Sequence, residues 1–231
     1  MQIVLLCGGL GTRLKSVVGS TPKGLIRINN KHFIEYIFES FLEYKIKKVH
    51  LCLGFGSKQY IALIKKLNTP FEISYSIEKE NFLLGTGGAL KNSLEYFEDN
   101  FIVQYGDSIL RLNYKILYSQ HLNSGKDMTM SILSKVHTSE TPNMRCTFDQ
   151  KGNINCIYDK FDSSLEANYI DYGALVFKKC IFKNITADRF DLASVQKNLT
   201  KEKRATFFEV KKPYIEIGNP RSLEMAKFFL K

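Results

Sequence analysis

Apolar and polar positions in the first half of the chain form two patterns, one typical of strands and one typical of helices. Short apolar or alternating runs predict strands at residues 3–7, 49–53, 71–77 and 101–105. Apolar residues at helical spacing predict helices at residues 32–44, about 57–67 and 88–97. Because alternating strands and helices form parallel sheets with helices on both faces, we expect a Rossmann-like α/β fold with a mostly parallel sheet.

The second half of the chain is less regular. It predicts strands at residues 128–135, 143–148, 154–158, 169–177 and 207–210, and a helix at 222–230. No internal repeat, low-complexity segment or Pro/Gly-rich linker divides the sequence. We therefore expect a single domain over residues 1–231, whose second half completes the substrate side of the fold.

A glycine-rich loop, residues 8–13, follows the first predicted strand. Glycine lets backbone N–H groups approach a polyanion closely because no Cβ intervenes, and the guanidinium of Arg13 suits phosphate oxygens. A P-loop would end in Lys-Ser or Lys-Thr, and Leu14 stands where a dinucleotide fingerprint has its third glycine. The residues fit either a loop for a phosphorylated ligand or a glycine-rich surface turn.

Three later segments carry similar chemistry. Asp107 follows a glycine at the end of a buried strand, where a carboxylate can hold magnesium or simply close a turn. Lys23, after Pro22, offers a point charge to a phosphate or is an exposed loop lysine. The glycines of residues 85–88 can bring the backbone against a flat base or form the entry to a helix.

Composition narrows the class of protein. The 231 residues are 44% hydrophobic and 24% charged, as in soluble globular proteins. No run of about 18 apolar residues predicts a membrane span, and no secretory signal is recognised, so we expect a cytoplasmic protein without a membrane partner. Five scattered cysteines with no CxxC pair favour reduced thiols over disulfides or a zinc site.

The formal charge of +10 is spread along the chain. A nucleic-acid-binding protein would concentrate its lysines and arginines on one element, so we expect no nucleic-acid partner. The charge is equally consistent with an enzyme that acts on anionic phosphates and with general use of lysine as a solvated residue.

Six motifs in order resemble those of sugar-1-phosphate nucleotidyltransferases. They are Gly8-Gly9-Leu10-Gly11-Thr12-Arg13-Leu14, Pro22-Lys23, Leu84-Gly85-Thr86-Gly87-Gly88-Ala89, Gly106-Asp107, Asp159-Lys160 and Ile215-Glu216-Ile217-Gly218. Within that family, the residues 6–16 and 75–80 and the short length are similar to bacterial D-glycero-D-manno-heptose 1-phosphate guanylyltransferases. The resemblance covers nearly the whole chain and implies the fold of nucleotide-diphospho-sugar transferases.

The resemblance assigns nucleotide binding to about residues 1–110 and sugar phosphate binding to about residues 111–231. It implies that Gly8, Gly9, Gly11, Thr12, Gly85, Thr86, Gly87 and Gly88 bind the nucleotide, that Arg13, Lys23 and Lys160 are catalytic, that Asp159, Lys160, Asp171 and Gly173 bind the sugar phosphate, and that Asp107 and Glu216 hold magnesium.

Three residues depart from the family pattern. Glu216 is one methylene longer than the usual Asp, and Asp159 is shorter than the usual Glu. Asp171 stands where Asn is common, and an ionised Asp accepts hydrogen bonds but cannot donate them. All three lie on the sugar side, so the sugar phosphate need not be the usual heptose.

The resemblance implies an enzyme that joins a nucleoside triphosphate, GTP in the heptose group, to a heptose or hexose 1-phosphate. Pyrophosphate would leave, and the nucleotide sugar would serve surface polysaccharide synthesis. Alternatives are transfer from CTP, UTP or dTTP to another sugar or non-sugar phosphate, a nucleotide sensor without turnover, and a nucleic-acid-binding role. Retention of Arg13, Lys23, Asp107 and Lys160 favours catalysis over sensing. Homo-oligomerisation stays open.

Overall fold

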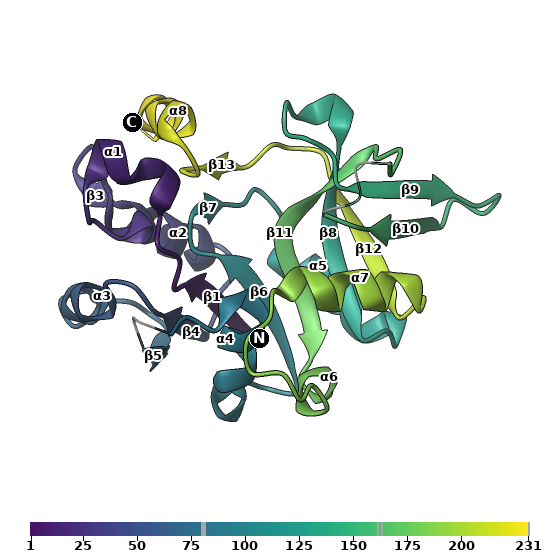
Figure 1. Ribbon diagram of the computed structural model, residues 1–231, viewed down its shortest axis with the longest axis horizontal. Coiled ribbons are helices and arrows are strands. Elements are labelled where there is room, and N and C mark those ends of the chain that lie inside the picture. The colour runs from purple at the N-terminus through teal and green to yellow at the C-terminus, as the bar shows by residue number, and fades with distance from the viewer. Residues whose placement is uncertain (80–81, 161, 163, 231) are drawn as a thin grey trace.

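A mixed sheet forms the centre of the structure, a computed structural model that describes residues 1–79, 82–160, 162 and 164–230. Within those residues the sheet has nine strands in the order β10-β9-β11-β6-β1-β4-β5, with β8 beside β11 and β12 beside β8 (Figure 1). They are β1 (Gln2–Cys7), β4 (Lys48–Leu53), β5 (Glu72–Ile77), β6 (Asn100–Tyr105), β8 (Met128–Ser134), β9 (Met144–Phe148), β10 (Ile154–Tyr158), β11 (Tyr169–Lys178) and β12 (Ala205–Val210).

The strands of this sheet run mostly in one direction. β1 pairs in parallel with β4 and β6, and β5 continues the parallel set beyond β4. β11 runs antiparallel to its neighbours β6 and β8, and β10 runs antiparallel to β9. The predicted mostly parallel Rossmann-like sheet is therefore confirmed, with β10 and β11 as its reversed strands.

Helices cover both faces of the sheet. They are α1 (Lys15–Val18), α2 (Phe33–Leu42), α3 (Ser57–Ile64), α4 (Gly85–Asn92), α5 (Tyr114–Ser124), α6 (Cys180–Lys183), α7 (Leu192–Lys201) and α8 (Pro220–Phe229). One core cluster includes residues of α2, α5 and α8, and the other includes residues of α4, α6 and α7. Alternate residues of β1 enter opposite clusters, Ile3 and Leu5 on one face and Val4 on the other, because a strand turns successive side chains to opposite sides.

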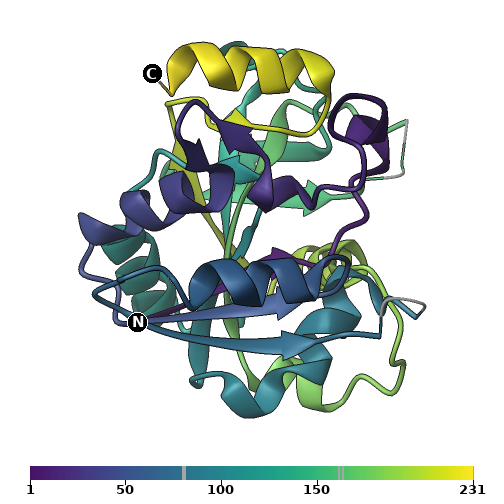
Figure 2. The same ribbon diagram turned by 90° about the vertical axis from the view of Figure 1, so that its left-hand side faces the viewer.

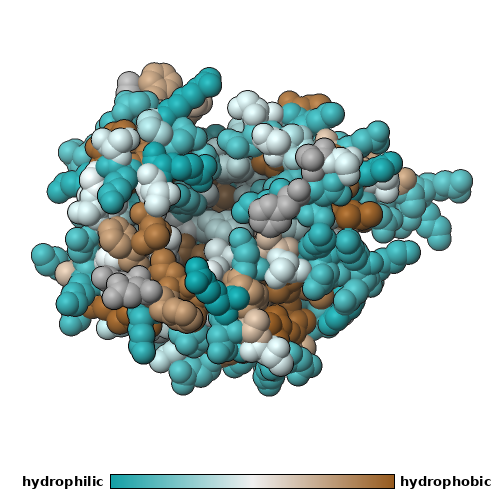
Figure 3. All heavy atoms as spheres, in the orientation of Figure 1, coloured by the Kyte–Doolittle hydropathy of each residue, from teal (hydrophilic) through white to brown (hydrophobic). Residues whose placement is uncertain are grey.

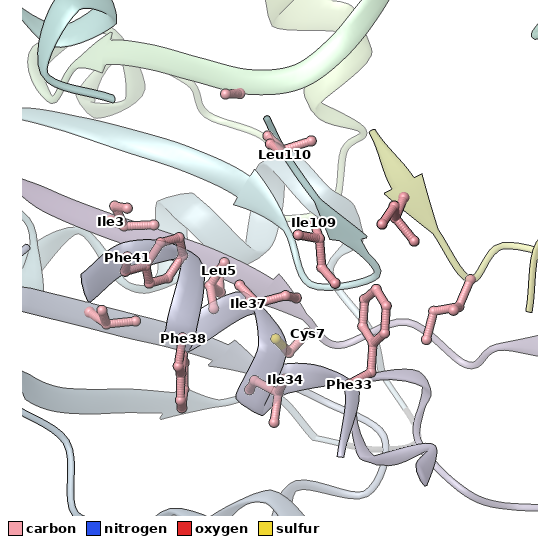
Figure 4. Close-up of a cluster of buried hydrophobic side chains, with 14 of the residues drawn as sticks. Ile3, Leu5, Cys7, Phe33, Ile34, Ile37, Phe38, Phe41, Ile109 and Leu110 are labelled. Atoms are coloured by element: carbon pink, nitrogen blue, oxygen red, sulfur yellow. The ribbon is translucent and has the colours of Figure 1, made fainter. Parts of the chain in front are cut away.

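The packing of α2 on β1 shows how the helical spacing produces this core. Phe33, Ile34, Ile37, Phe38 and Phe41 form one buried stripe of α2. In Figure 4 this stripe lies against the β1 side chains. Spacing of three and four residues places these positions on the same face of the helix, as the sequence predicted.

Two short strand pairs complete the edge of the molecule near the C-terminus. β2 (Arg27–Ile28) pairs with β3 (Lys31–His32), and β7 (Ser108–Ile109) pairs with β13 (Ile215–Glu216). The backbone oxygen of Leu230, just after α8, accepts hydrogen bonds from the side chains of Asn29 and Tyr36. Figure 2 shows α8, in yellow, beside the purple segment that carries β2 and β3, in agreement with those bonds.

Most sequence-predicted elements are confirmed, with shifted ends. The predicted helix 88–97 begins earlier, because the glycines at 85–88 form the first turn of α4, and it ends at Asn92 before a 3-10 turn at Leu94–Tyr96. The sequence analysis did not predict α1, α5, α6, α7 or the short strands β2, β3, β7 and β13. Within the described residues, no helix is long and apolar enough to cross a membrane.

The expectation that all five cysteines are reduced is wrong. Cys146 and Cys156 form a disulfide. They are ten residues apart in sequence, but they face each other directly in the β9–β10 pairing, with Cα atoms 4.1 Å apart. The absence of a CxxC motif did not exclude this disulfide, because the register of the hairpin, and not close spacing in the sequence, brings the two side chains together.

The disulfide predicts a specific labelling pattern. Iodoacetamide should modify Cys180 in the native protein, because its thiol is exposed while those of Cys7 and Cys52 are buried. Three cysteines should react after unfolding without reductant, and all five after reduction. Replacing Cys146 and Cys156 together with Ser should lower the free energy of unfolding by about 2–3 kcal/mol in urea titrations. Cys180→Ser serves as the control, and labelling of all five thiols without reductant would contradict the pairing.

Candidate functional site

The carboxyl ends of the parallel strands meet at one edge of the sheet. The N–H of Gly106, just after β6, donates to the backbone oxygen of Leu6 at 3.0 Å. A Cβ on Gly106 would lie 2.5 Å from the sulfur of Cys7, and a Cβ on Gly54 would lie 2.8 Å from the oxygen of Gly8. Only glycine allows the chain segments beyond these strands to approach so closely. This brings the glycine-rich loop and the residues after β6 together.

A pocket of about 260 Å³ opens at this edge of the sheet. It is lined by Leu6, Cys7, Gly8, Gly9, Lys23, Cys52, Tyr60, Glu78, Leu83, Gly85, Thr86, Ala89, Tyr105, Gly106 and Asp107. Mostly apolar walls with a few charged groups are typical of a site for a small organic ligand. In Figure 3, apolar residues are exposed over the β4 and α4 region, whereas most of that face is polar.

Lys23 and Asp107 form an ion pair in this pocket. The Lys23 ammonium lies 2.8 Å from Oδ2 of Asp107, and both side chains are partly exposed, at 19% and 27%. An exposed pair of this kind contributes little to stability. Its importance is chemical, because it places a cation and a hard carboxylate side by side where the strands end.

Tyr60 of α3 supports the turn that carries Lys23. Its hydroxyl accepts a hydrogen bond from the N–H of Gly24 at 3.0 Å, and its side chain is 2% exposed. Burial raises the pKa of Tyr60 well above its ordinary value, so the hydroxyl stays neutral. A Cβ on Gly24 would lie 2.6 Å from that hydroxyl oxygen, which explains the glycine after Lys23.

The second glycine-rich turn has two sides. Gly85 and Thr86 line the pocket. Gly87 and Gly88 are buried instead, and both of their N–H groups donate to the backbone oxygen of Phe190 at 3.0 and 3.2 Å. A Cβ on Gly87 would lie 2.2 Å from the Phe190 ring. These two glycines therefore allow α4 to pack against the segment before α7, and their N–H groups are already bonded to protein.

The first glycine loop also divides into a pocket part and an exposed part. Gly8 and Gly9 line the pocket, and Gly11 has a left-handed backbone with φ of 63°. Thr12 and Arg13 begin a 3-10 turn with exposed side chains, outside the residues that line the pocket. Burial raises the pKa of Glu216, and the positive charge of Arg13 acts in the opposite direction.

Asp107 and Glu216 lie close enough to interact electrostatically. Glu216 lies in β13, which pairs with β7, the strand that begins just after Asp107. The N–H of Ile217 donates to the backbone oxygen of Asp107 at 3.0 Å. Burial, then the charges of Glu140 and Asp107, raise the pKa of Glu216. The described residues contain no group of three or more possible metal ligands. Two carboxylates still fit magnesium, which commonly takes one or two carboxylates and completes its shell with phosphate and water.

The residues expected to bind a sugar phosphate gather beside α7. Asp159 is buried and lies 2.6 Å from the ammonium of Lys197. Asp171 accepts from Gln196 Nε2 at 2.7 Å and from the N–H of Gly173 at 2.9 Å. Burial raises the pKa of Asp171 to about 6, and the charge of the exposed Lys160 acts in the opposite direction.

Four site residues received no role in the sequence analysis. Tyr60, Glu78, Gln196 and Lys197 contact or surround the predicted residues. A signal for the last two was present: Asp191 is an N-cap residue followed by apolar positions at helical spacing, which predicts α7. Glu78 lies in the segment 75–80 that carried part of the resemblance, but no role of its own was assigned to it. Tyr60 had no such signal, since it reaches the pocket through tertiary packing.

A family model described as nucleotidyl transferase matches residues 2–229 of the chain. In structure, the chain is similar to HddC from Yersinia pseudotuberculosis, whose crystal structure contains GMP-PN. The TM-score is 0.80 at 28% identity, and the match covers 100% of this chain and 99% of that one. The inositol-1-phosphate CTP transferase from T. maritima, at 18% identity and a TM-score of 0.73, shares the fold.

Two curated relatives are D-glycero-alpha-D-manno-heptose 1-phosphate guanylyltransferases. The protein from Campylobacter jejuni is 41% identical over 113 residues, which cover 49% of this chain and 50% of the relative. The protein from Aneurinibacillus thermoaerophilus is 33% identical over 133 residues, 57% of each chain. The chain thus matches about half of the length of these relatives.

Asp107→Asn tests the role of this carboxylate. The amide keeps the size of the side chain but loses its charge, so it holds neither Lys23 nor a divalent cation as well. We expect turnover to fall by about 10²-fold or more with the thermal midpoint of unfolding little changed. Asp188→Asn is the matched control, because Asp188 also pairs with a lysine, Lys91, at 2.7 Å but lies outside the pocket. Equal activities of the two variants would exclude Asp107 from the reaction.

Proposed function

The chain belongs to the nucleotidyl transferase family, and we propose on that basis that it joins a nucleoside triphosphate to a sugar 1-phosphate. The products would be a nucleotide sugar and pyrophosphate. The family match over residues 2–229 carries the proposal. The Lys23–Asp107 pair agrees with it, because it stands at the strand ends where ligands bind in such sheets.

The proposed reaction needs charge neutralisation more than proton transfer. An oxygen of the sugar phosphate attacks the α-phosphorus of the triphosphate, and pyrophosphate leaves from the opposite side. The attacking oxygen is already anionic, so positioning and electrostatic stabilisation supply the catalysis. In this proposal Lys23 and Arg13 would act on the triphosphate and Lys160 on the sugar phosphate, and these cations would offset the phosphate charge. Magnesium held by Asp107 and Glu216 would add further positive charge to the phosphates.

Tyr60 and Gly24 give Lys23 a fixed base for this role. The Lys23 ammonium starts 2.8 Å from Asp107, and the buried hydroxyl of Tyr60 holds the following N–H in place. A lysine anchored at its backbone loses less freedom when it binds a phosphate. This arrangement supports Lys23 as a residue that acts on the triphosphate.

Glu78 supports guanine as the base. Its side chain lines the pocket and is 7% exposed, and one carboxyl oxygen accepts from the Leu84 N–H at 3.0 Å. A carboxylate presents only hydrogen-bond acceptors when ionised. The Watson–Crick edge of guanine offers two adjacent donors, N1–H and the N2 amino group, whereas uracil and thymine offer one N–H between two carbonyl oxygens. GTP therefore complements this wall of the pocket better than UTP or dTTP does.

The relatives support a heptose or related hexose 1-phosphate as the second substrate, since two of them are heptose 1-phosphate guanylyltransferases. Lys160 offers a cation for the phosphate, while Asp159 and Asp171 offer hydrogen-bond acceptors to hydroxyl groups. We further propose that the nucleotide sugar serves surface polysaccharide synthesis and is made in the cytoplasm, where nucleoside triphosphates are supplied.

A panel of nucleoside triphosphates and sugar phosphates tests this proposal. Pyrophosphate release should require both substrates and a divalent cation, and GTP should give the highest kcat/KM. Glu78→Gln should lower kcat/KM for GTP by about tenfold or more, because the amide has one acceptor and one donor group, and should narrow the preference over UTP and CTP. Glu72→Gln is the matched control, an exposed glutamate of the same strand region.

The outcomes of the panel separate the parts of the proposal. If CTP or UTP outperforms GTP with every sugar phosphate, the guanylyl assignment fails and nucleotidyl transfer stands. If pyrophosphate is released only with a non-sugar phosphate, the assignment of a sugar 1-phosphate as the second substrate fails. Absence of pyrophosphate release from every pair, with magnesium or manganese present, would contradict the enzymatic function itself.

A further inference from the structure

Gln196 is a buried polar residue on the inner face of α7. Its side chain has no solvent exposure, and the residues around it on that face, Leu192, Val195 and Leu199, are apolar. Burying an amide group costs free energy unless both of its ends form hydrogen bonds. A buried glutamine at this position therefore points to a hydrogen-bond partner, to which an apolar side chain could not bond.

The amide group of Gln196 is satisfied at one end. Its Nε2 donates to Oδ2 of Asp171 at 2.7 Å. Its Oε1 is the one buried side-chain nitrogen or oxygen atom, among the described residues, without a hydrogen-bond partner. Reversing the amide would set two acceptor oxygens against each other. The side chain of Gln196 therefore forms one hydrogen bond, to Asp171, and leaves its buried Oε1 unpaired, which costs free energy.

The backbone around Asp171 also holds its carboxyl group in place. The pairing of β11 with β8 shifts register between Asp171 and Leu175, and Gly173 in this bulge has a φ of 99°. The N–H of Gly173 donates to Oδ1 of Asp171, and the side chain of Asn143 accepts from the Asp171 N–H at 3.0 Å. Each carboxyl oxygen of Asp171 thus has one protein donor, and β11 has a bulge that begins at this residue.

The neighbours of Asp171 define its electrostatic surroundings. Lys160 favours the ionised carboxylate. Burial raises the pKa values of Tyr105, Tyr158 and Tyr214, and the nearby charge of Asp171 raises them further. Burial raises the pKa of Asp171 to about 6, and the hydrogen bond from Gln196 is the largest influence that lowers it.

The next residue of α7 acts on the second carboxylate of this region. The ammonium of Lys197 lies 2.6 Å from Oδ2 of Asp159, which is 8% exposed. Two consecutive residues of one helix therefore contact the two carboxylates expected at the sugar phosphate, which makes α7 the element that supports that side of the site.

We propose that Gln196 is a positioning residue that holds Asp171 as a hydrogen-bond acceptor for hydroxyl groups of the sugar phosphate, so that the enzyme selects a phosphorylated polyol. The inference rests on the proposed function. An ionised Asp171 repels a second phosphate or a carbonyl oxygen and attracts hydroxyl groups, while the nearby Lys160 offers charge to the single phosphate.

Gln196→Met tests this role because methionine has a similar volume and no donor group. We expect KM for the sugar phosphate to rise by about tenfold or more, the effect of losing a hydrogen bond to a charged group, with KM for the triphosphate unchanged. Binding requires the ionised form, so kcat/KM for the sugar phosphate should rise with pH through a midpoint near 6 in the unmodified chain. Loss of the Gln196 bond raises the pKa of Asp171, so this limb should move to higher pH.

Stability measurements separate positioning from a purely structural role. Gln196→Met removes the unpaired oxygen but also leaves Oδ2 of Asp171 without its donor, so any fall in the thermal midpoint should shrink at low pH, where Asp171 is protonated, whereas a purely structural loss would not depend on pH. Asn198→Ala, an exposed position of the same helix, is the control and should change neither KM nor the pH profile. A Gln196→Met enzyme with an unchanged KM for the sugar phosphate and an unchanged pH limb would overturn the proposal.

A titration without turnover distinguishes this inference from the proposed function. The Asp171 carboxyl carbon can be followed by NMR in protein labelled with ¹³C-aspartate, with Asp171→Asn used for assignment. The pKa of Asp171 should be higher in Gln196→Met than in the unmodified chain. Equal values would overturn the positioning role even in an active enzyme, whereas a shifted value with no transfer from any substrate pair would defeat the proposed function alone.

Discussion

The structure depends on the burial of β1 between two parallel neighbours. Its alternate side chains enter two separate core clusters, so its register with β4 and β6 cannot slip without exposing apolar residues. That register places the ends of the three strands at one edge. Gly106 and Gly54 permit the close approach there, and the ion pair of Lys23 with Asp107 forms at the place that results.

A second contact joins this edge to the opposite half of the molecule. The N–H groups of Gly87 and Gly88 bond to the Phe190 oxygen, and Thr86 donates to the side chain of Asp191, the N-cap of α7. The turn that lines the pocket is thus fixed to the helix that carries Gln196 and Lys197. The geometry of the two proposed substrate sites is set by the same short segment.

Local patterns predicted the parts of the site that are local. An apolar strand followed by glycines, or by Gly-Asp, is visible within a few residues of sequence. The sequence therefore predicted that Gly8, Gly9 and Asp107 follow strand ends, and these residues line the pocket. Tyr60 and the Cys146–Cys156 pair were not predicted, because Tyr60 contacts a residue distant in sequence and the two cysteines meet across a hairpin. The resemblance also assigned Gly87 and Gly88 to the nucleotide. In the structure these two glycines pack against the segment around Phe190, a contact that cannot be predicted from the sequence around them.

Hydrogen–deuterium exchange with each substrate alone tests the central claim, that the strand ends hold the nucleotide and the α7 side holds the sugar phosphate. GTP with magnesium should slow exchange in residues 8–14 and 84–90. A heptose or hexose 1-phosphate should slow it in residues 158–160, 169–175 and 192–201. Glu216 also lines a second pocket, so the contradicting result is protection that centres on the parts of that pocket away from it, residues 137–140 and 222–229, without protection of residues 8–14 and 84–90.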